Sequence, residues 1–443
     1  MPTNDHLKIG GPGRLIGQPG HLRIQGVLHF NRGFNLDWRS TGIVYWPLFS
    51  GNMKSVSNYI KYQDPNYPNY FNSYTLSTAT PTVSNINTCA VLVSGSQYGK
   101  IYVTGSNNSM RIYDPKTQTY ATPTFGTGVQ TGTIQTCVLL YDKTVCNIPA
   151  PTTASTSFPI TVYDPNQNKV IAKSTRIYCN TTSTPDYWSS IMLPSDPSVI
   201  PGTTAGTVFL PPYGSQYPAI YDPTADTLTQ ITSVAYGTGN AGSANQFYRD
   251  CALLPSGRIF MVPSLATSAA IYDPASQQSS FVSGPPNLFG AGRYYHAVTL
   301  LDGRVFCSPY LAPSPNYRSA LIYDETTNTF TQTTPILTSV RKSILLPDGR
   351  VFCLPVTTQD QTVGTNPRAA IYDPTNNTVS YIDITGVTST NANPATDFYR
   401  AAAMQFDGKI FAPPGSASAP LIFGTINYSF DWNVLSSAYH NAR

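Results

Sequence analysis

The residues of this 443-residue chain that could bind a metal ion or act as strong nucleophiles are seven cysteines and five histidines. The cysteines contain no C-x-x-C pair, and their odd number argues against a disulfide framework. The histidines are scattered: His6, His21, His29, His296 and His440. We therefore predict no metal site and no bound cofactor.

Acidic side chains, which serve enzymes as general acids and bases, are also few. Only one of the 22 acidic residues, Glu325, is a glutamate. Six of the aspartates recur in a Tyr-Asp element, where aspartate is a typical turn former. Because neither a carboxylate pair nor a Ser-His-Asp arrangement is visible, the sequence predicts no catalytic residues and a protein that is not an enzyme.

The Tyr-Asp element is the clearest sign of an internal repeat. Its tyrosines follow one another at intervals of 49 to 58 residues. The copies are Tyr113-Asp114-Pro115, Tyr163-Asp164-Pro165, Tyr221-Asp222-Pro223, Tyr272-Asp273-Pro274, Tyr323-Asp324 and Tyr372-Asp373-Pro374. Degenerate copies at Tyr62 and Phe423 extend the series to eight units of about fifty residues.

A second element precedes each copy, and its clearest example is LLPDGRVFCLP at residues 345–355. Asp-Gly between apolar runs predicts a two-residue hairpin turn. Tyr-Asp-Pro predicts another turn, because aspartate favours its first position and proline fixes φ at its second. Each unit is therefore predicted to form four short antiparallel strands, which is one blade of a β-propeller.

The predicted fold is all-β, with a single β-propeller over residues 27–443 and an extended N-terminal arm over residues 1–26. Eight units favour eight blades. Seven is the alternative: residues 21–30 would then add an edge strand to the last blade and close the ring, and the first unit would be an extension.

These elements resemble the kelch-type repeats of the central domain of galactose oxidase. The resemblance covers roughly residues 85–430 and, more faintly, 30–80. In place of the double glycine that usually follows the second kelch strand, this chain has Pro212, Pro263, Pro309, Pro355 and Pro414. The proline-bearing variant is similar to propellers of bacteriophage tail and virion proteins. The copper ligands and tyrosine–cysteine crosslink of galactose oxidase have no visible counterpart here.

The register of the repeat accounts for most of the cysteines. One position of the first strand carries Cys89, Cys137 and Cys251, and one position of the second strand is assigned Cys146, Cys307 and Cys353. Only Cys179 lies outside these two positions. We interpret the six as small apolar residues of the blade cores.

One register position carries the residues best suited to binding. It lies eight residues before the turn glycine, where the strand nearest the channel begins in kelch-like blades. Its occupants are Arg249, Tyr295, Arg341 and Arg400, with Trp188, Gln135 and Asn87 in the weaker units. Arginine supplies planar donor forks and aromatic rings supply stacking faces, so we predict a site for an anionic or sugar-like ligand at the channel mouth. The alternative is that each arginine bonds carbonyls of the neighbouring blade.

Charge is scarce in this chain. Charged residues make up 11% of it and the net charge is +4, whereas an ordinary soluble domain is about 25% charged. This balance predicts no nucleic-acid partner. The lack of an apolar run of membrane-spanning length predicts no membrane insertion, and the N-terminus lacks the apolar core of a signal peptide.

From these features we expect a non-enzymatic structural protein of a virus particle, assembled in the host cytoplasm. Among virion proteins we expect a phage tail component, such as a fibre, spike or nozzle protein, within a larger symmetric assembly. Its arm would order against other virion proteins, and its propeller would dock neighbouring subunits or face a host receptor. The alternative is a carbohydrate-binding propeller that reads host glycans.

Overall fold

The computed structural model describes the following residues of the chain: 9–10, 15–18, 21–24, 27–28, 73–77, 85–106, 109–130, 132–151, 156–178, 185–193, 206–233, 246–284, 289, 294–310, 319–336, 339–346, 349–355, 368–387, 398–405 and 409–424.

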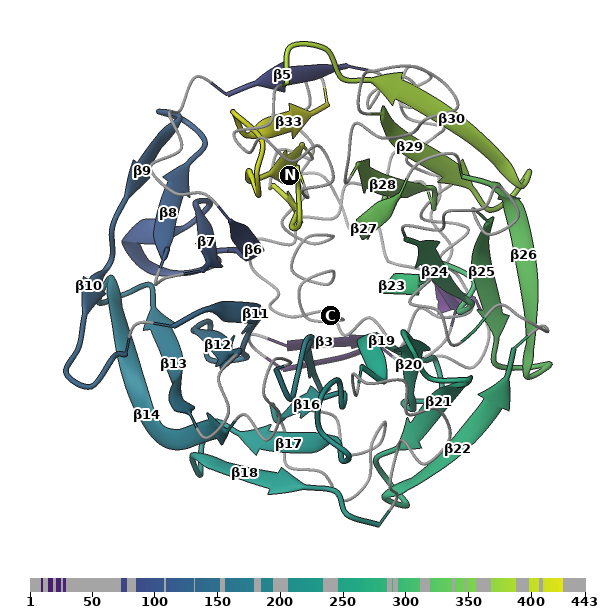
Figure 1. Ribbon diagram of the computed structural model, residues 1–443, viewed down its shortest axis with the longest axis horizontal. Helices are drawn as coiled ribbons and strands as arrows, with labels where there is room; N and C mark the ends of the chain where they lie inside the picture. Colours follow the sequence, from purple (N-terminus) through teal and green to yellow (C-terminus); the bar gives the residue numbers. More distant parts are fainter. Residues whose placement is uncertain are drawn as a thin grey trace.

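Seven four-stranded antiparallel blades surround a central channel, so the protein is an all-β propeller (Figure 1). Within each blade the strands are given from the channel outward. Blades 1 to 3 consist of β6 (Ile86–Val91), β7 (Ile101–Gly105), β8 (Arg111–Asp114) and β9 (Thr119–Ala121); of β11 (Ile134–Leu139), β12 (Val145–Pro149), β13 (Ser157–Asp164) and β14 (Lys169–Tyr178); and of β15 (Ile191–Met192), β16 (Val208–Leu210), β17 (Ala219–Asp222) and β18 (Thr227–Gln230). Blades 4 to 7 consist of β19 (Tyr248–Leu253), β20 (Ile259–Pro263), β21 (Ser268–Asp273) and β22 (Gln278–Ser283); of β23 (Tyr294–Thr299), β24 (Val305–Pro309), β25 (Ser319–Asp324) and β26 (Thr329–Pro335); of β27 (Val340–Leu345), β28 (Val351–Pro355), β29 (Arg368–Asp373) and β30 (Thr378–Asp383); and of β31 (Ala403–Met404), β32 (Ile410–Ala412), β33 (Leu421–Phe423) and β5 (Tyr74–Leu76). Blade 2 carries a fifth strand, β10 (Thr124–Phe125), parallel to β14 on its outer edge.

The favoured count of eight blades is wrong, and the alternative count of seven is correct. The reason is that the first repeat unit contributes one strand, β5, to the last blade. This strand pairs with β33, with Tyr74 opposite Phe423 and Leu76 opposite Leu421. The degenerate copy at Tyr62 lies outside the described residues. Pairing of β5 with β33 covers the edge that blade 7 would otherwise expose and joins the two ends of the ring.

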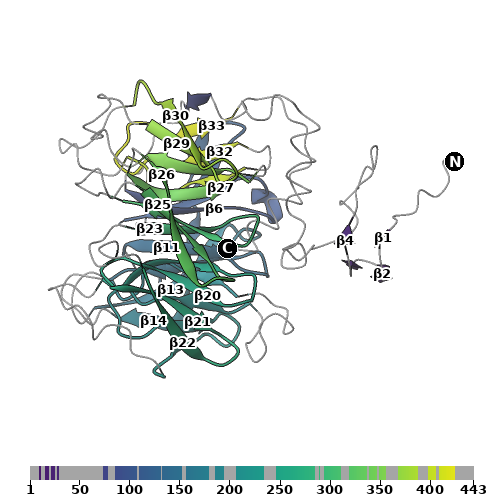
Figure 2. The same ribbon diagram turned by 90° about the vertical axis from the view of Figure 1, so that its right-hand side faces the viewer.

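The strand that was expected to close the ring, at residues 21–30, does not do so. Strand β3 (His21–Ile24) pairs with β2 (Leu15–Gln18), and β4 (Val27–Leu28) pairs with β1 (Ile9–Gly10). These four strands join no blade (Figure 2). The boundary at residue 26 between arm and propeller stays a prediction.

The core consists of seven apolar clusters, one at each junction between neighbouring blades. Aromatic pairs recur at these junctions, because the tyrosine of a Tyr-Asp element stacks on the aromatic residue in the second strand of the preceding blade. The stacked pairs are Tyr113–Phe411, Tyr163–Tyr102, Tyr272–Phe209, Tyr323–Phe260 and Tyr372–Phe306, with ring centroids 4.2–5.3 Å apart. The two sequence elements therefore recur together because they pack against each other between blades.

The Tyr-Asp-Pro turns form as predicted. In all six copies from Tyr113 to Tyr372 the aspartate Oδ1 accepts the backbone N–H of the residue two positions later, at 2.8–2.9 Å. The residue five positions after the tyrosine has a positive φ of 50–57°. Asparagine favours this left-handed conformation, and in blade 5 Asn328 also accepts a hydrogen bond from the Tyr323 hydroxyl, at 2.9 Å.

The inner hairpins differ from the predicted two-residue turns. In blade 4 the N–H of Gly257 donates to the carbonyl of Leu254, and the N–H of Leu254 donates to the carbonyl of Arg258. Gly257 has φ +85° and the preceding Ser256 does not have a positive φ. This geometry is a three-residue loop with glycine in the left-handed position, and Gly303 of blade 5 repeats it.

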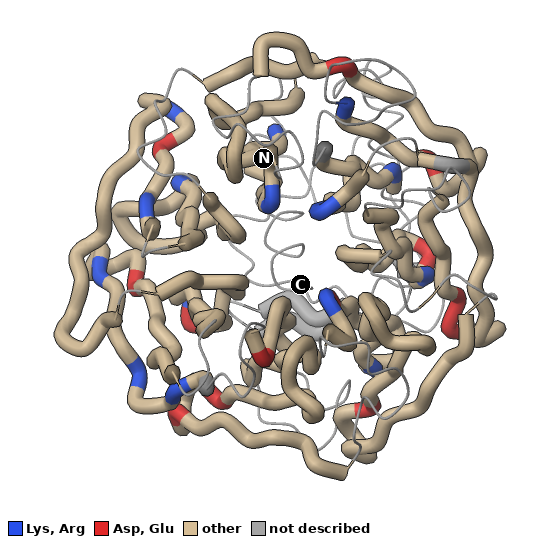
Figure 3. Tube along the Cα trace, in the orientation of Figure 1, with Lys and Arg blue, Asp and Glu red and all other residues tan. Residues whose placement is uncertain are grey.

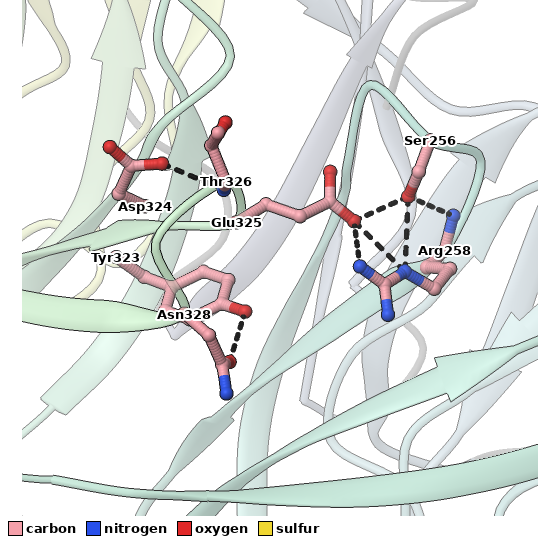
Figure 4. A network of polar contacts seen from close by, with 7 residues as sticks. All are labelled: Ser256, Arg258, Tyr323, Asp324, Glu325, Thr326 and Asn328. Carbon is pink, nitrogen blue, oxygen red and sulfur yellow. Dashed lines mark hydrogen bonds and ion pairs between the residues drawn. The ribbon is translucent and has the colours of Figure 1, made fainter.

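Glu325 takes the place of proline in the turn of blade 5 and ties this turn to blade 4 (Figure 4). Its Oε1 accepts hydrogen bonds from Arg258 Nε at 2.9 Å and from the Ser256 hydroxyl, and it lies 2.7 Å from Arg258 Nη2. The single glutamate of the chain is thus a structural link on the outside of the ring. No helix within the described ranges is long and apolar enough to cross a membrane.

We expect the ring to depend on β5 and not on the strands before it. A chain that starts at residue 73 keeps β5 and should keep its melting temperature. A chain that starts at residue 80 loses the half-buried Tyr74 and Leu76 against the last blade, which is worth about 3 kcal/mol and should lower the melting temperature by about 5 °C or more. Thermal unfolding followed by circular dichroism measures both, and equal melting temperatures would contradict the closure.

Candidate functional site

Each inner strand contains a one-residue bulge at the register position that the sequence singles out. In blade 4, Tyr248 pairs with Pro263 and Asp250 with Val262, so Arg249 is an extra residue without a partner on β20. The same one-residue shift occurs in blades 1, 2, 5 and 6. In blades 3 and 7 the shift lies between an isolated bridge, Tyr187–Pro212 or Tyr399–Pro414, and the first paired residue of β15 or β31. A bulge re-aims a side chain, and here it exposes the extra residue and its successor to the channel.

Proline lies opposite the residue that precedes the bulge in six blades, and Gly105 takes this position in blade 1. The pairs are Ile134–Pro149, Tyr187–Pro212, Tyr248–Pro263, Tyr294–Pro309, Val340–Pro355 and Tyr399–Pro414. Proline is tolerated in a strand at a bulge because its missing N–H is not needed there. The prolines that replace the kelch glycines are therefore the partners of the bulges.

The predicted ring residues converge on one cavity of about 260 Å³ in the channel. It is lined by the occupants of all seven positions: Asn87, Gln135, Trp188, Arg249, Tyr295, Arg341 and Arg400. Figure 3 shows basic positions on the inner parts of several blades around the centre of the ring, whereas most acidic positions lie farther out. The structure thus brings together every residue of the predicted site.

The Arg249 guanidinium is stacked among aromatic rings. Its Cζ lies 3.7 Å from the ring centroid of Tyr295, 4.5 Å from that of Trp188 and 4.9 Å from that of Tyr213. The side chain is 9% exposed, and its Nε and Nη1 atoms find no hydrogen-bond acceptor among the described residues. Its Nη2 donates to Gln246 Oε1 at 3.3 Å. A buried donor without an acceptor costs about 1–3 kcal/mol, so this arrangement favours a ligand that supplies one.

Arg341 and Arg400 bring further positive charge to the same cavity. The Cζ of Arg341 lies 5.4 Å from the Tyr295 ring centroid. Burial, together with the like charges of Arg400 and Arg249, lowers the pKa of Arg341 to about 10. Burial also lowers the pKa of Arg400, whose Nη1 donates to Asn87 Oδ1 at 3.0 Å. Arg341 and Arg400 therefore stay charged at neutral pH, although burial and neighbouring positive charges disfavour the charged form.

A second polar layer lies one residue further along each inner strand. Asp250, His296 and Lys342 occupy it in blades 4, 5 and 6 and line the same cavity. Asp250 Oδ2 lies 3.2 Å from His296 Nε2, and His296 Nδ1 accepts the N–H of Ser343 at 3.3 Å. Because Nδ1 is an acceptor, the imidazole carries its proton on Nε2 and donates it to Asp250.

Asp250 is the hydrogen-bonding centre of this second layer. Besides His296, it accepts the Ser189 hydroxyl from blade 3 and the N–H of Ala297 from blade 5, the latter at 2.9 Å. Burial raises the pKa of Asp250, and the charge of Lys342 acts in the opposite direction. One carboxylate thus joins blades 3, 4 and 5 at their inner strands.

Side-chain hydrogen bonds join other inner strands in the same way. Asn87 Nδ2 donates to the carbonyl of Ile134 at 3.0 Å, which links blade 1 to blade 2. The hydroxyls of Thr136 and Ser190 lie 3.2 Å apart and link blade 2 to blade 3. Together with the contacts of Asp250, His296 and Arg400, the described residues place such a link at six blade junctions. This belt fixes the positions from which the ring residues project.

The loops after the second strands, whose aromatic residues the sequence marks as suited to carbohydrate or protein recognition, bring Tyr213 and Tyr310 to the site. The ring centroid of Tyr310 lies 3.5 Å from that of Tyr295, and Tyr213 packs on Trp188. Two residues that line the cavity were not singled out from the sequence. Asp250 and Lys342 directly follow ring residues. A signal for the second layer exists in the register, because six of its seven positions are polar: Thr88, Thr136, Ser189, Asp250, His296 and Lys342.

Four of the six repeat cysteines, Cys146, Cys251, Cys307 and Cys353, are buried as interpreted, whereas Cys89 and Cys137 are half-buried and line the cavity. Cys307 and Cys353 face the small first-strand residues Ala297 and Ser343. Cys146 lies one residue earlier than its assigned position, which Asn147 occupies, and takes the place that is aromatic in most blades. Burial raises the pKa of Cys137 to about 11, so its thiol stays protonated. Cys179 lies outside the described residues.

Solved structures with the same fold are distant in sequence. A virginiamycin B lyase from Staphylococcus aureus matches with a TM-score of 0.53 and 10% identity, over 80% of this chain and 100% of that chain. The extracellular domain of a hybrid two-component system from B. thetaiotaomicron matches with 0.53 and 13%, over 80% and 40%. A fungal alcohol oxidase of the AA5 family in complex with copper matches with 0.48 and 12%, over 82% and 78%. Such identities show the β-propeller fold alone.

Sequence comparison adds no family to this result. No protein-family model matches the chain. No curated protein matches it either. Among the described residues no group of three or more His, Cys, Asp or Glu side chains is placed to hold a metal ion. The kelch affiliation stays a prediction from the repeat elements.

We expect Asp250→Ala to destabilise the ring, because it leaves the buried Ala297 N–H and His296 Nε2, and the half-buried Ser189 hydroxyl, without their acceptor. The expected loss in the free energy of unfolding is about 3 kcal/mol or more. Asp302→Ala is the control: this aspartate pairs with Arg304 at the protein surface, and its removal should cost about 1 kcal/mol or less. Urea unfolding compares the two, and equal losses would contradict the role of Asp250.

Proposed function

We propose that the protein is a non-enzymatic recognition propeller that binds a sugar-like ligand at the mouth of its channel. The observation that carries this proposal is the convergence of seven bulged residues on one cavity, with arginines and aromatic rings side by side. Propellers host enzymes, lectins and scaffolds alike, so the proposal rests on this site and not on the fold.

The aromatic residues of the site suit the apolar faces of sugar rings. Trp188 and Tyr295 line the cavity, and Tyr213 packs on Trp188 with ring centroids 4.8 Å apart. Aromatic side chains combine a large contact area with low conformational entropy, and their polar ends accept or donate hydrogen bonds. Gln135 adds an amide to the cavity, and a primary amide can both donate to and accept from hydroxyl groups.

We expect Trp188→Ala and Tyr295→Ala each to weaken glycan binding by about tenfold or more, because buried aromatic anchors typically contribute over 1 kcal/mol. A glycan array identifies the ligand, and calorimetry measures the affinities. Tyr98→Ala is the control, since this tyrosine is 52% exposed and lies outside the cavity. Binding that survives both channel substitutions would contradict the proposed site.

We further propose that this recognition propeller is a component of a virus particle, such as a phage tail protein. The support comes from the outer strands β9, β18, β22 and β26, which contain no charged residue. Soluble proteins usually protect exposed edge strands with charges, bulges or covering segments. Phe281 on β22 is 50% exposed. Uncharged edges of this kind favour a ring that is packed among neighbouring subunits.

Cryo-electron microscopy of the particle that contains this chain tests the virion proposal. We expect the propeller in a symmetric assembly, with outer strands against neighbouring subunits and residues 1–26 ordered on another chain. A ring whose outer strands all face solvent, with the N-terminal segment in contact with no other chain, would contradict it. That result would leave the lectin-like function, which the binding experiment tests separately.

A further inference from the structure

We propose that the ligand of the channel mouth is an acidic saccharide, a sugar whose ring carries an anionic oxygen group such as a carboxylate. Its acidic group would be bound by Arg249, Arg341 and Arg400. This inference rests on the proposed function, because it names the class of sugar that the same site takes.

The charge of the cavity is unbalanced. Four basic residues line it, Arg249, Arg341, Lys342 and Arg400, and Asp250 is the one acidic residue among the described residues that line it. The Asp250 carboxylate already accepts hydrogen bonds from the Ser189 hydroxyl and the Ala297 N–H, besides its contact with His296. It therefore belongs to the belt between the blades, and basic residues outnumber acidic ones in the lining of the cavity.

The N–H groups of Arg249 that have no acceptor indicate which kind of ligand group would fit the cavity. More than nine-tenths of this side chain is buried, and Nε and Nη1 have no acceptor among the described residues. The aromatic faces around the guanidinium accept its charge but supply no oxygen atom. A carboxylate or sulfate offers oxygen acceptors that match the planar fork of arginine.

The three arginines come from three separate blades and line one cavity. Arg249 lies in blade 4, Arg341 in blade 6, and Arg400 at the start of blade 7. Burial and the charges of the other two lower the pKa of Arg341 to about 10. An anion placed among them would relieve this repulsion, because attraction between opposite charges is stronger in a partly buried site than in bulk water.

The size of the cavity and its aromatic walls favour a sugar over a simple inorganic anion. The volume of about 260 Å³ lies just below the roughly 300–1,000 Å³ of sites for drug-sized ligands. It suits the end of a glycan, with one or two rings inserted. Trp188 and Tyr295 would then contact the ring faces while the arginines bind its acidic group.

Matched pairs of methyl glycosides test the inference on the full chain by calorimetry. Each pair differs in charge at one position: methyl glucuronide with methyl glucoside, methyl galacturonide with methyl galactoside, and the methyl glycoside of N-acetylneuraminic acid with its methyl ester. We expect the acidic member of at least one pair to bind about tenfold or more tightly than its neutral partner. Glucoside 6-sulfate distinguishes a need for carboxylate from a need for any anionic group.

Variants separate charge recognition from stability. Arg249→Gln and Arg341→Gln should reduce the preference for the acidic member to about threefold or less, and salt should weaken only the acidic member. Arg111→Gln is the control, because Arg111 lies on the third strand of blade 1, outside the cavity, and should leave the preference unchanged. A variant whose melting temperature matches the parent but which keeps the full preference would overturn the inference.

The remaining outcomes are also decisive. Equal binding of acidic and neutral members, still dependent on Trp188, would overturn the acidic ligand and leave the sugar-binding function standing. Binding of no saccharide in any pair would overturn both proposals.

Discussion

The site depends on one constraint of the backbone, the extra residue that each inner strand carries opposite its partner. An antiparallel ladder without a bulge would turn alternate side chains of the first strand away from the channel. With the bulge, two successive residues such as Arg249 and Asp250 both reach the cavity. The first forms the binding layer and the second forms the belt that holds the blades. Proline on the facing strand stabilises this geometry because no ladder hydrogen bond is required there.

The belt and the interblade clusters form the framework that holds a polar, positively charged channel lining in place. Each junction buries an apolar cluster, and aromatic stacking such as Tyr323 on Phe260 fixes the distance between blades. Strand β5 completes blade 7, and its Tyr74 and Leu76 pack against the cluster between blades 6 and 7. Most of this framework consists of apolar clusters and second-layer contacts, which offset the cost of placing Arg249, Arg341 and Arg400 together in the channel.

The sequence predicted the propeller and its ring of site residues because both elements of the repeat are local. Asp-Gly and Tyr-Asp-Pro specify turns, and the spacing between them fixes the register of Arg249, Arg341 and Arg400. The number of blades was not predictable in this way, because β5 is separated by more than 300 residues from the strand it completes. The role of Asp250 was missed for a similar reason: its partners lie on neighbouring blades, and no local pattern identifies them.

The central claim is that the bulges of the inner strands bring Arg249, Arg341 and Arg400 to one cavity, where they bind an anion. An anomalous-scattering map of crystals of the full chain soaked in sodium iodide tests this most directly, because iodide needs no assumption about the natural ligand. The account predicts an iodide peak at the channel mouth in contact with the guanidinium groups of Arg249, Arg341 and Arg400. Iodide peaks only at surface positions, with an unoccupied channel mouth, would contradict it.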